Sequence, residues 1–327
     1  MNVLDHGVNP TKAKHSKKLT PRLAQMMDGF EKEDPPTEKK LPVEIDVPEY
    51  IAKGKSQCGA AQQSKRYRSE SLMKAIGDLV LIAFYFLLRV GEYTVKGTKN
   101  WTKQTKQFCL KDVTFFKRDE NNKLTQISRR ASNKERLAAH SATMRIRNQK
   151  NGWKNVCINQ EKNGKLFLCP VKALARRYNH IQKHVRNAKK AQDTYLSAYF
   201  ESNGKRGDVT DEDVRINLKI AAEGLHYLES RGIPTIRVDT HSLRSGGGNA
   251  LSLAGYSDRQ IKKMGRWRGE TFMEYIREEL QCFSEGMSKS MSRMFNFVNV
   301  AGGACHDVTP TMIVTDYNTN VVSSDEE

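Results

Sequence analysis

The stretch LMKAIGDLVLIAFYFLLRVGEY, residues 72–93, contains the longest apolar run of the chain, Leu79–Leu88. That run is too short to cross a bilayer, which needs about 20 consecutive apolar residues. From Leu72 onward the apolar residues recur at the spacing of a helix. The stretch therefore predicts a helix that begins near Ser69, is buried on most sides and ends near Gly91.

A small β region is expected after this helix. Val113–Phe116 has the composition of a strand, and Thr143–Arg147 alternates polar with apolar side chains. The dipeptide Asn151-Gly152 is typical of a type I′ hairpin turn, and Val156–Ile158 is the expected return strand. This hairpin would carry Lys150 at its tip.

The chain from Pro170 onward has mainly helical periodicity. One helix is predicted to have Thr240 as its N-cap and to end near Gly255. Residues 246–248 of this helix are three glycines, each of which costs about 1 kcal/mol relative to alanine inside a helix. Close approach of another backbone would explain them, and a frayed helix is the alternative. The predicted fold class is mainly α with a small antiparallel β-sheet (α+β).

The chain is strongly basic. It has 327 residues, with 55 Lys and Arg against 37 Asp and Glu, which gives a formal net charge of +18. The last 31 residues hold five acids and no Lys or Arg, so the rest of the chain carries +18 − (−5) = +23. An excess of this size favours a polyanion as partner, nucleic acid before a membrane surface. A charge that only keeps the protein in solution is the alternative.

The composition also divides the chain. Residues 1–64 are rich in Lys, Pro, Gln and Gly and are expected to form a basic arm that is disordered or loosely helical. Residues 65–296 are the expected folded domain, and residues 297–327 an acidic disordered tail. No apolar secretion signal opens the chain, and the six cysteines form no CxxC pair. We expect a protein that is not secreted, nuclear in a eukaryotic host and otherwise cytoplasmic.

Five residues scattered over this domain have complementary chemistry. A tyrosine nucleophile needs assistance because its phenol, with a pKa of about 10, is protonated at neutral pH. Histidine can assist the removal of that proton, lysine can protonate a leaving oxygen, and two arginines can bind the oxygens of one phosphate. Each residue taken alone has an ordinary structural explanation. The five are Arg89, Lys150, His241, Arg244 and Tyr275.

From about Ser69 to Met294 the chain resembles the catalytic domain of the tyrosine recombinases, also called phage-type integrases. LLRVGE resembles the first arginine box of that family, with Arg89 as the arginine and Glu92 as its acidic companion. QKNGWK resembles the hairpin with the catalytic lysine, which is Lys150 in preference to Lys154. HSLRSGG matches the His-x-x-Arg box with His241 and Arg244, and MGRW followed by YIR matches the final box with Tyr275.

The chain departs from the family at one position. The family usually has His or Trp nine residues before the tyrosine, whereas this chain has Arg266 there and Trp267 one residue later. Either side chain is a candidate for the expected hydrogen bond to the phosphate. The sequences around the final box and Leu168–Leu174 resemble recombinases of eukaryotic mobile elements of the Crypton or DIRS type.

The resemblance implies DNA strand cleavage and rejoining through a covalent 3′-phosphotyrosine, in site-specific recombination or integration. It implies double-stranded DNA as partner, a homo-oligomer, expected as a tetramer, on that DNA, and neither a metal nor another cofactor. A membrane and a small-molecule substrate are not expected. Two alternatives remain: relaxation of DNA as by a type IB topoisomerase, and a domesticated DNA-binding protein that does not cut. Retention of all five residues argues against the second alternative. The N-terminal region argues for it, because we expect it to be too short and too polar for the DNA-clamping domain that is usual in the family.

Overall fold

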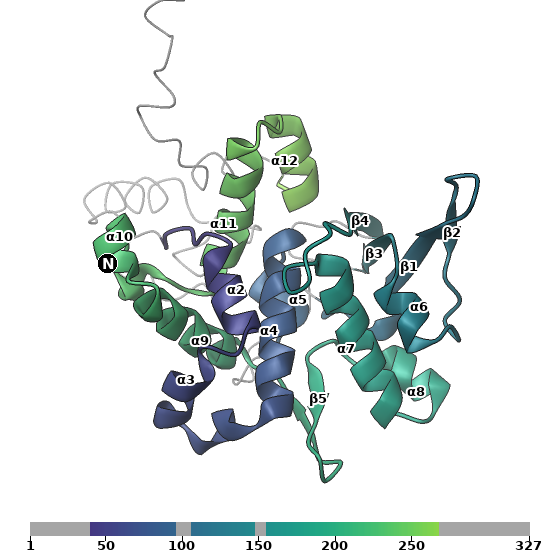
Figure 1. Cartoon of the computed structure of the whole chain (residues 1–327), viewed down its shortest axis with the longest axis horizontal. Coiled ribbons are helices and arrows are strands. Elements are labelled where there is room, and N and C mark those ends of the chain that lie inside the picture. The colour runs from purple at the N-terminus through teal and green to yellow at the C-terminus, as the bar shows by residue number, and fades with distance from the viewer. Residues whose placement is uncertain (1–39, 96–105, 148–154, 268–327) are drawn as a thin grey trace, which may run out of the picture. The chain divides into compact units, whose positions relative to one another are not determined.

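The computed structural model describes residues 40–95, 106–147 and 155–267 (Figure 1). Lys150, Lys154 and Tyr275 lie outside the described residues, and so do residues 1–39 of the expected arm, the expected domain boundary at residue 296 and the acidic tail. Within the described ranges, no helix is long and apolar enough to cross a membrane. The described residues also contain no cluster of three His, Cys, Asp or Glu side chains placed to hold a metal ion.

Helix α4, Glu70–Tyr85, is the centre of the fold (Figure 1). The Ser69 side chain caps it by accepting a hydrogen bond from the amide of Leu72 at 3.1 Å. The prediction of a helix buried on most sides is confirmed, since α4 is buried almost without interruption from Leu72 to Phe84. Helices α2 and α7, together with α11, all pack against it.

The predicted end of this helix is wrong. Helix α4 stops at Tyr85, and Leu87 takes a left-handed conformation with φ +49°. After this turn Leu87 packs with Ile261 and Trp267, whereas Phe86 and Leu88 remain in the main core. A second short helix, α5, Val90–Tyr93, then begins with Arg89 as its N-cap.

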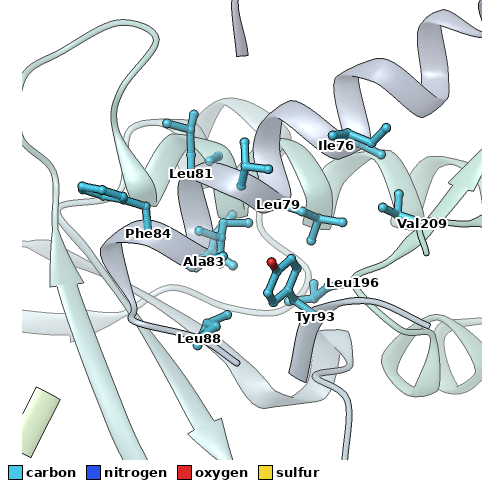
Figure 2. Packing of buried hydrophobic residues seen from close by; sticks show 14 of the residues in the cluster. Ile76, Leu79, Leu81, Ala83, Phe84, Leu88, Tyr93, Leu196 and Val209 are labelled. Atoms are coloured by element: carbon cyan, nitrogen blue, oxygen red, sulfur yellow. The ribbon is translucent and has the colours of Figure 1, made fainter. Parts of the chain in front are cut away.

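Figure 2 shows how the core closes around α5. Tyr93 belongs to the same cluster of buried residues as Leu79 of α4 and as Leu196 and Val209, which come from distant parts of the chain. Tyr93 is 1% exposed. The α4–α5 junction is thus held between the central helix and the second half of the chain.

The main sheet has four antiparallel strands in the order β2–β1–β3–β4. The predicted strands and their antiparallel pairing are confirmed, because β3 pairs with β4 from Ser141–Glu161 to Ile146–Val156. A second sheet pairs β5 with β6. The strands are β1 Val113–Arg118, β2 Leu124–Gln126, β3 Ser141–Ile146, β4 Val156–Glu161, β5 Ala198–Phe200 and β6 Arg206–Asp208.

Residues 40–64 belong to the fold and are not part of an arm, so the expected boundary at residue 64 is wrong. They form α2, Asp46–Ala52, and α3, Gln57–Gln63. Val47 and Ile51 are at most 1% exposed. Gly77 of α4 lets α2 approach closely, since a Cβ there would lie 3.0 Å from the Cα of Ala52. These few apolar residues are diluted among polar ones, which is why composition alone assigned them to the arm.

The ends of the remaining helices are fixed by capping residues. Pro170 is in the first turn of α7, and Thr210 forms a capping box with Asp213. The predicted N-cap Thr240 is wrong, because the N-cap of α11 is Asp239. The fold is mainly helical with a small antiparallel sheet, as predicted. These helices are α6 Asn133–Leu137, α7 Pro170–His184, α8 Ala188–Asp193, α9 Asp211–Gly224, α10 Tyr227–Arg231, α11 Thr240–Leu253 and α12 Asp258–Gly265, with short 3-10 turns at Lys65–Arg68, Leu110–Asp112 and Thr235–Arg237.

Candidate active site

Arg89 and Glu92 lie together at the α4–α5 junction. The backbone amide of Arg89 donates a hydrogen bond to Oε2 of Glu92 at 2.9 Å. The guanidinium Nη1 of Arg89 lies 3.7 Å from Oε1 of the same carboxylate. The side chain of Arg89 is 23% exposed, whereas that of Glu92 is 2% exposed. The buried carboxylate of Glu92 therefore contacts both the backbone amide and the guanidinium of Arg89, and part of the Arg89 side chain remains exposed.

Helix α11 brings His241 and Arg244 to this junction. Its first turn is fixed by Asp239, whose Oδ1 accepts from the amide of Thr240 at 2.5 Å and lies 3.3 Å from Nε of Arg215. His241 is exposed, and Arg244 is 2% exposed. The two residues share one side of the helix, as predicted, but they lie at different depths.

The three glycines of α11 allow this helix to lie directly on backbone. A Cβ at Gly246 would collide with the carbonyl oxygen of Val43, and one at Gly247 with that of Phe84. At Gly248 it would meet only the ring of Trp267, at an ordinary 3.5 Å. Close approach of another backbone is thus the reason for Gly246 and Gly247, and the alternative of a frayed helix is wrong.

Arg244 points into the junction. Its Nη1 donates to the carbonyl oxygen of Leu87 at 2.6 Å, and its Nη2 donates to the carbonyl oxygen of Gly265. The indole of Trp267 stacks on the guanidinium, with 4.4 Å from Cζ to the ring centroid. Arg244 thus joins the end of α4 to the end of α12.

Arg266 is buried beside it. The residue caps α12 in a left-handed conformation, with φ +59°, and is 0% exposed. Its Nη2 donates to the carbonyl oxygen of Leu87 at 3.0 Å and to Oε2 of Glu92 at 2.9 Å. The guanidinium is therefore committed to an internal carboxylate, which the sequence resemblance did not indicate.

The contacts connect three guanidiniums around one carboxylate. The carbonyl oxygen of Leu87 accepts from Nη1 of Arg244 at 2.6 Å and from Nη2 of Arg266 at 3.0 Å. These two nitrogens are therefore no farther apart than the two distances added together. Glu92 contacts Arg266 through Oε2 and Arg89 through Oε1. Three positive charges around one negative charge make this a site that favours an anion.

The electrostatics of His241 agree with this placement. The pKa of His241 is lowered, with loss of hydration as the largest cause, followed by the charges of Arg244 and Arg89. We attribute the lowered pKa mainly to the charges of Arg244 and Arg89, because the exposed imidazole ring of His241 keeps much of its hydration. A lowered pKa keeps the imidazole neutral at physiological pH and able to accept a proton. Burial also lowers the pKa of Arg266, which Glu92 opposes.

The described ends of the β3–β4 hairpin are tied to the same junction. Arg147, directly after β3, donates to the carbonyl oxygen of Gln107 at 2.5 Å. The next residue, Phe108, donates its amide to the carbonyl oxygen of Glu92 at 2.9 Å. Lys150 itself lies three residues beyond Arg147, outside the described residues.

The structure therefore unites Arg89, Glu92, His241, Arg244 and the Arg266–Trp267 pair. It does not describe Lys150 or Tyr275. Two participants were missed from the sequence, the carbonyl oxygen of Leu87 and the N-cap Asp239. An aspartate directly before Thr240 was a usable signal for the cap, whereas no sequence pattern indicates a particular carbonyl oxygen.

Comparisons with known proteins give distant likenesses. No protein-family model and no curated protein matches the chain. Among solved structures, the Tn1549 transposon integrase in complex with circular intermediate DNA has 12% identity and a TM-score of 0.35, and covers 82% of this chain and 76% of that chain. A variant of that integrase with transposon right-end DNA has 13% identity and a TM-score of 0.35, with 79% and 69% covered. These likenesses are too distant to assign the chain to a family.

Proposed function

We propose that this chain is a DNA breaking and rejoining enzyme of the tyrosine recombinase type. The observation that carries the proposal is the convergence of Arg89, His241 and Arg244 on one junction. Arg89 and Arg244 are 155 residues apart in the sequence. Packing of the core alone gives no reason for two arginines and a neutral histidine to gather at one site that favours an anion.

In this proposal the basic side chains bind one phosphodiester. Arg89 contacts a non-bridging oxygen, because its guanidinium is held from behind by Glu92 while part of it remains exposed. Arg244 lies deeper and adds positive charge where the transition state gains negative charge on the phosphate oxygens. Fixed charges of this kind are usually the largest contribution to catalysis. The N-terminal end of α11 adds a favourable dipole.

The covalent steps use Tyr275 and Lys150. The phenolic oxygen of Tyr275 attacks phosphorus, the bond to the 5′ oxygen breaks, and a 3′-phosphotyrosine forms with release of a 5′ hydroxyl. Neutral His241 accepts or relays the phenolic proton, and the ammonium of Lys150 gives a proton to the leaving oxygen. Attack of a 5′ hydroxyl on the phosphotyrosine reverses these steps and rejoins the strand. The proposed chemistry uses no metal or cofactor.

The geometry of the site changes the role expected for Arg266. Its guanidinium is 0% exposed and hydrogen-bonded to Glu92 and to two backbone carbonyl oxygens. We propose that Arg266 positions Glu92 and through it Arg89, and that Trp267 positions Arg244 by stacking. Neither residue is then a ligand of the phosphate.

The partner in this proposal is double-stranded DNA, supported by the +23 charge of residues 1–296. We further propose assembly as a tetramer on DNA, origin from a mobile element of the Crypton or DIRS type, and a nuclear site of action in a eukaryotic host. Sedimentation of the protein with and without duplex DNA tests the tetramer.

A nicked duplex that traps the cleaved strand tests the chemistry. The wild-type chain should form a covalent protein–DNA adduct that survives denaturation, and Arg89→Ala should form far less. Binding of duplex without any adduct would instead identify a DNA-binding protein that does not cut. Relaxation of supercoiled plasmid without strand exchange would identify a topoisomerase-like activity.

A further inference from the structure

A cavity of about 640 Å³ lies between α4, α7 and β5. This volume is within the usual range of small-molecule sites. Lys74 and Asp78 of α4 line it, thirteen and nine residues before Leu87. At 1.5 Å per residue, the cavity lies roughly 13–20 Å along the helix from the candidate active site. It is a separate site on the molecule.

The cavity carries an excess of positive charge. Four basic side chains line it, against the carboxylates of Asp78 and Glu201. Asp78 is paired with Arg176 at 2.5 Å, and Glu201 accepts from the hydroxyl of Ser69 at 2.7 Å. Lys74 is paired at 2.6 Å with Glu70, in an exposed pair that a phosphate can replace. The four basic side chains are Lys74, Arg176, Arg177 and Lys183.

Arg177 is the most deeply buried of these basic side chains. The residue is 2% exposed, and its guanidinium donates to the carbonyl oxygens of Leu196, at 3.2 Å, and Ala198. Burial lowers the pKa of Arg177 to about 10, so the side chain stays charged at neutral pH, and the carboxylates of Asp78 and Asp208 partly offset its charge. Because Asp78 is already paired with Arg176, an anion in the cavity would further stabilise this buried charge.

The charges of the lining converge on His180. Burial, as the largest cause, and the charges of Arg177, His184, Lys183 and Lys74 together lower the pKa of His180 to about 4. Its Nε2 accepts from the amide of Phe200 at 3.1 Å, which fits a neutral ring. The potential inside the cavity is therefore positive, although His180 itself is neutral.

Aromatic rings form one side of the same cavity. The ring of His184 stacks on that of Phe200 with a centroid distance of 5.0 Å and an interplanar angle of 3°, and the ring of His180 lies 4.6 Å from that of His184. Phe167, which is 50% exposed, lies at the edge. Flat rings of this kind stack on planar bases, with about 1–3 kcal/mol per base in nucleic-acid complexes.

We propose that this cavity binds a free nucleotide, with its phosphates at Lys74, Arg177 and Lys183 and its base against the histidine and phenylalanine rings. Basic side chains recognise phosphate through charge-assisted hydrogen bonds. The proposal does not depend on the DNA chemistry at the α4–α5 junction.

Calorimetric titration of the full chain, free of nucleic acid, with ADP tests the site. ADP should bind, and adenosine and pyrophosphate should each bind more weakly because each lacks one half of the contacts. Lys183→Glu, an exposed substitution, should weaken ADP binding by about tenfold or more, since it replaces a charge-assisted contact with repulsion. The matched substitution Lys123→Glu, in the β1–β2 turn, should leave ADP binding unchanged.

Two further variants separate this site from others. Arg89→Ala should leave ADP binding unchanged, which excludes binding at the candidate active site. His184→Ala should weaken ADP while leaving pyrophosphate unchanged, because it removes only a ring. A 5′-phosphorylated trinucleotide that binds more tightly than ADP, and through Lys183, would assign the site to a strand end and contradict a free nucleotide. Absence of ADP binding at millimolar concentration, or full binding by Lys183→Glu, would overturn the proposal.

Discussion

Glu92→Gln is the substitution that tests the described part of the candidate active site most sharply. It preserves the shape of the side chain and removes its charge. Glu92 is 2% exposed in its side chain, and its Oε2 accepts from the amide of Arg89 and from Nη2 of Arg266, both at 2.9 Å. A glutamine can keep its oxygen at the position of Oε2, but its amide nitrogen would then take the place of Oε1 and face Nη1 of Arg89, which lies 3.7 Å from Oε1. Arg266 would remain buried with no opposite charge.

The expected cost follows from that burial. Removing one partner of a buried ion pair destabilises a protein by about 3–5 kcal/mol, a large share of a typical total of about 5–15 kcal/mol. With a urea m-value of about 1–3 kcal/mol/M, the unfolding midpoint should fall by at least about 1 M. Urea unfolding followed by circular dichroism measures this directly.

Glu161→Gln is the matched control. The side chain of Glu161 is 56% exposed and lies 3.6 Å from Nε2 of His140. Exposed pairs contribute about 0–1 kcal/mol, so its midpoint should hardly move. Adding Arg266→Met to Glu92→Gln should recover part of the loss, because the uncompensated charge is then gone. The reasoning is refuted if Glu92→Gln costs no more than Glu161→Gln.

Three further predictions concern the same junction. Arg89→Ala should lower the rate of adduct formation by about 10²–10³-fold, as for loss of one fixed donor to an oxyanion, with little change in the urea midpoint; an unchanged single-turnover rate would exclude Arg89 from the site. Gly247→Ala should cost about 1–3 kcal/mol, because its Cβ collides with the carbonyl oxygen of Phe84, whereas Gly248→Ala should be neutral or gain up to about 1 kcal/mol in the same unfolding assay; equal effects would contradict the close packing of α11. Because the pKa of His241 is lowered, the acidic limb of the pH–rate profile should lie below the ordinary histidine pKa of about 6.5. The neutral ring is favoured in the folded state, so the stability that His241 contributes should be lost as the pH falls below about 6.5 and through its lowered pKa. An acidic limb that stays in place in His241→Asn would show that another group titrates.

Much of this architecture could be predicted from local patterns. The apolar run from Leu79 identified a buried helix. Alternation identified the strand before Lys150, and the Asn151-Gly152 dipeptide indicated the return strand after it. The glycines at 246–248 correctly indicated close backbone packing. In each case the relevant signal lies within one element, where periodicity and residue size act directly.

The parts that could not be predicted depend on tertiary contacts. Nothing in the spacing of Glu92 and Arg266, which are 174 residues apart, indicates that they form an ion pair. The end of α4 at Tyr85 depends on pockets that receive Phe86 and Leu87 separately, and the helical pattern runs on past it. The burial of α2 likewise depends on Gly77, which lies in a different helix.

The central claim is that the arginines and the histidine at this junction serve a covalent reaction of Tyr275 with DNA. The most direct test incubates wild type and Tyr275→Phe with a nicked duplex that traps the cleaved strand, and maps the modified residue by mass spectrometry. The account predicts a 3′-phosphotyrosyl adduct on Tyr275 in the wild type and none in Tyr275→Phe, with duplex binding unchanged, because phenylalanine has no oxygen to attack phosphorus. An adduct that persists in Tyr275→Phe, or one that maps to another residue, would contradict it.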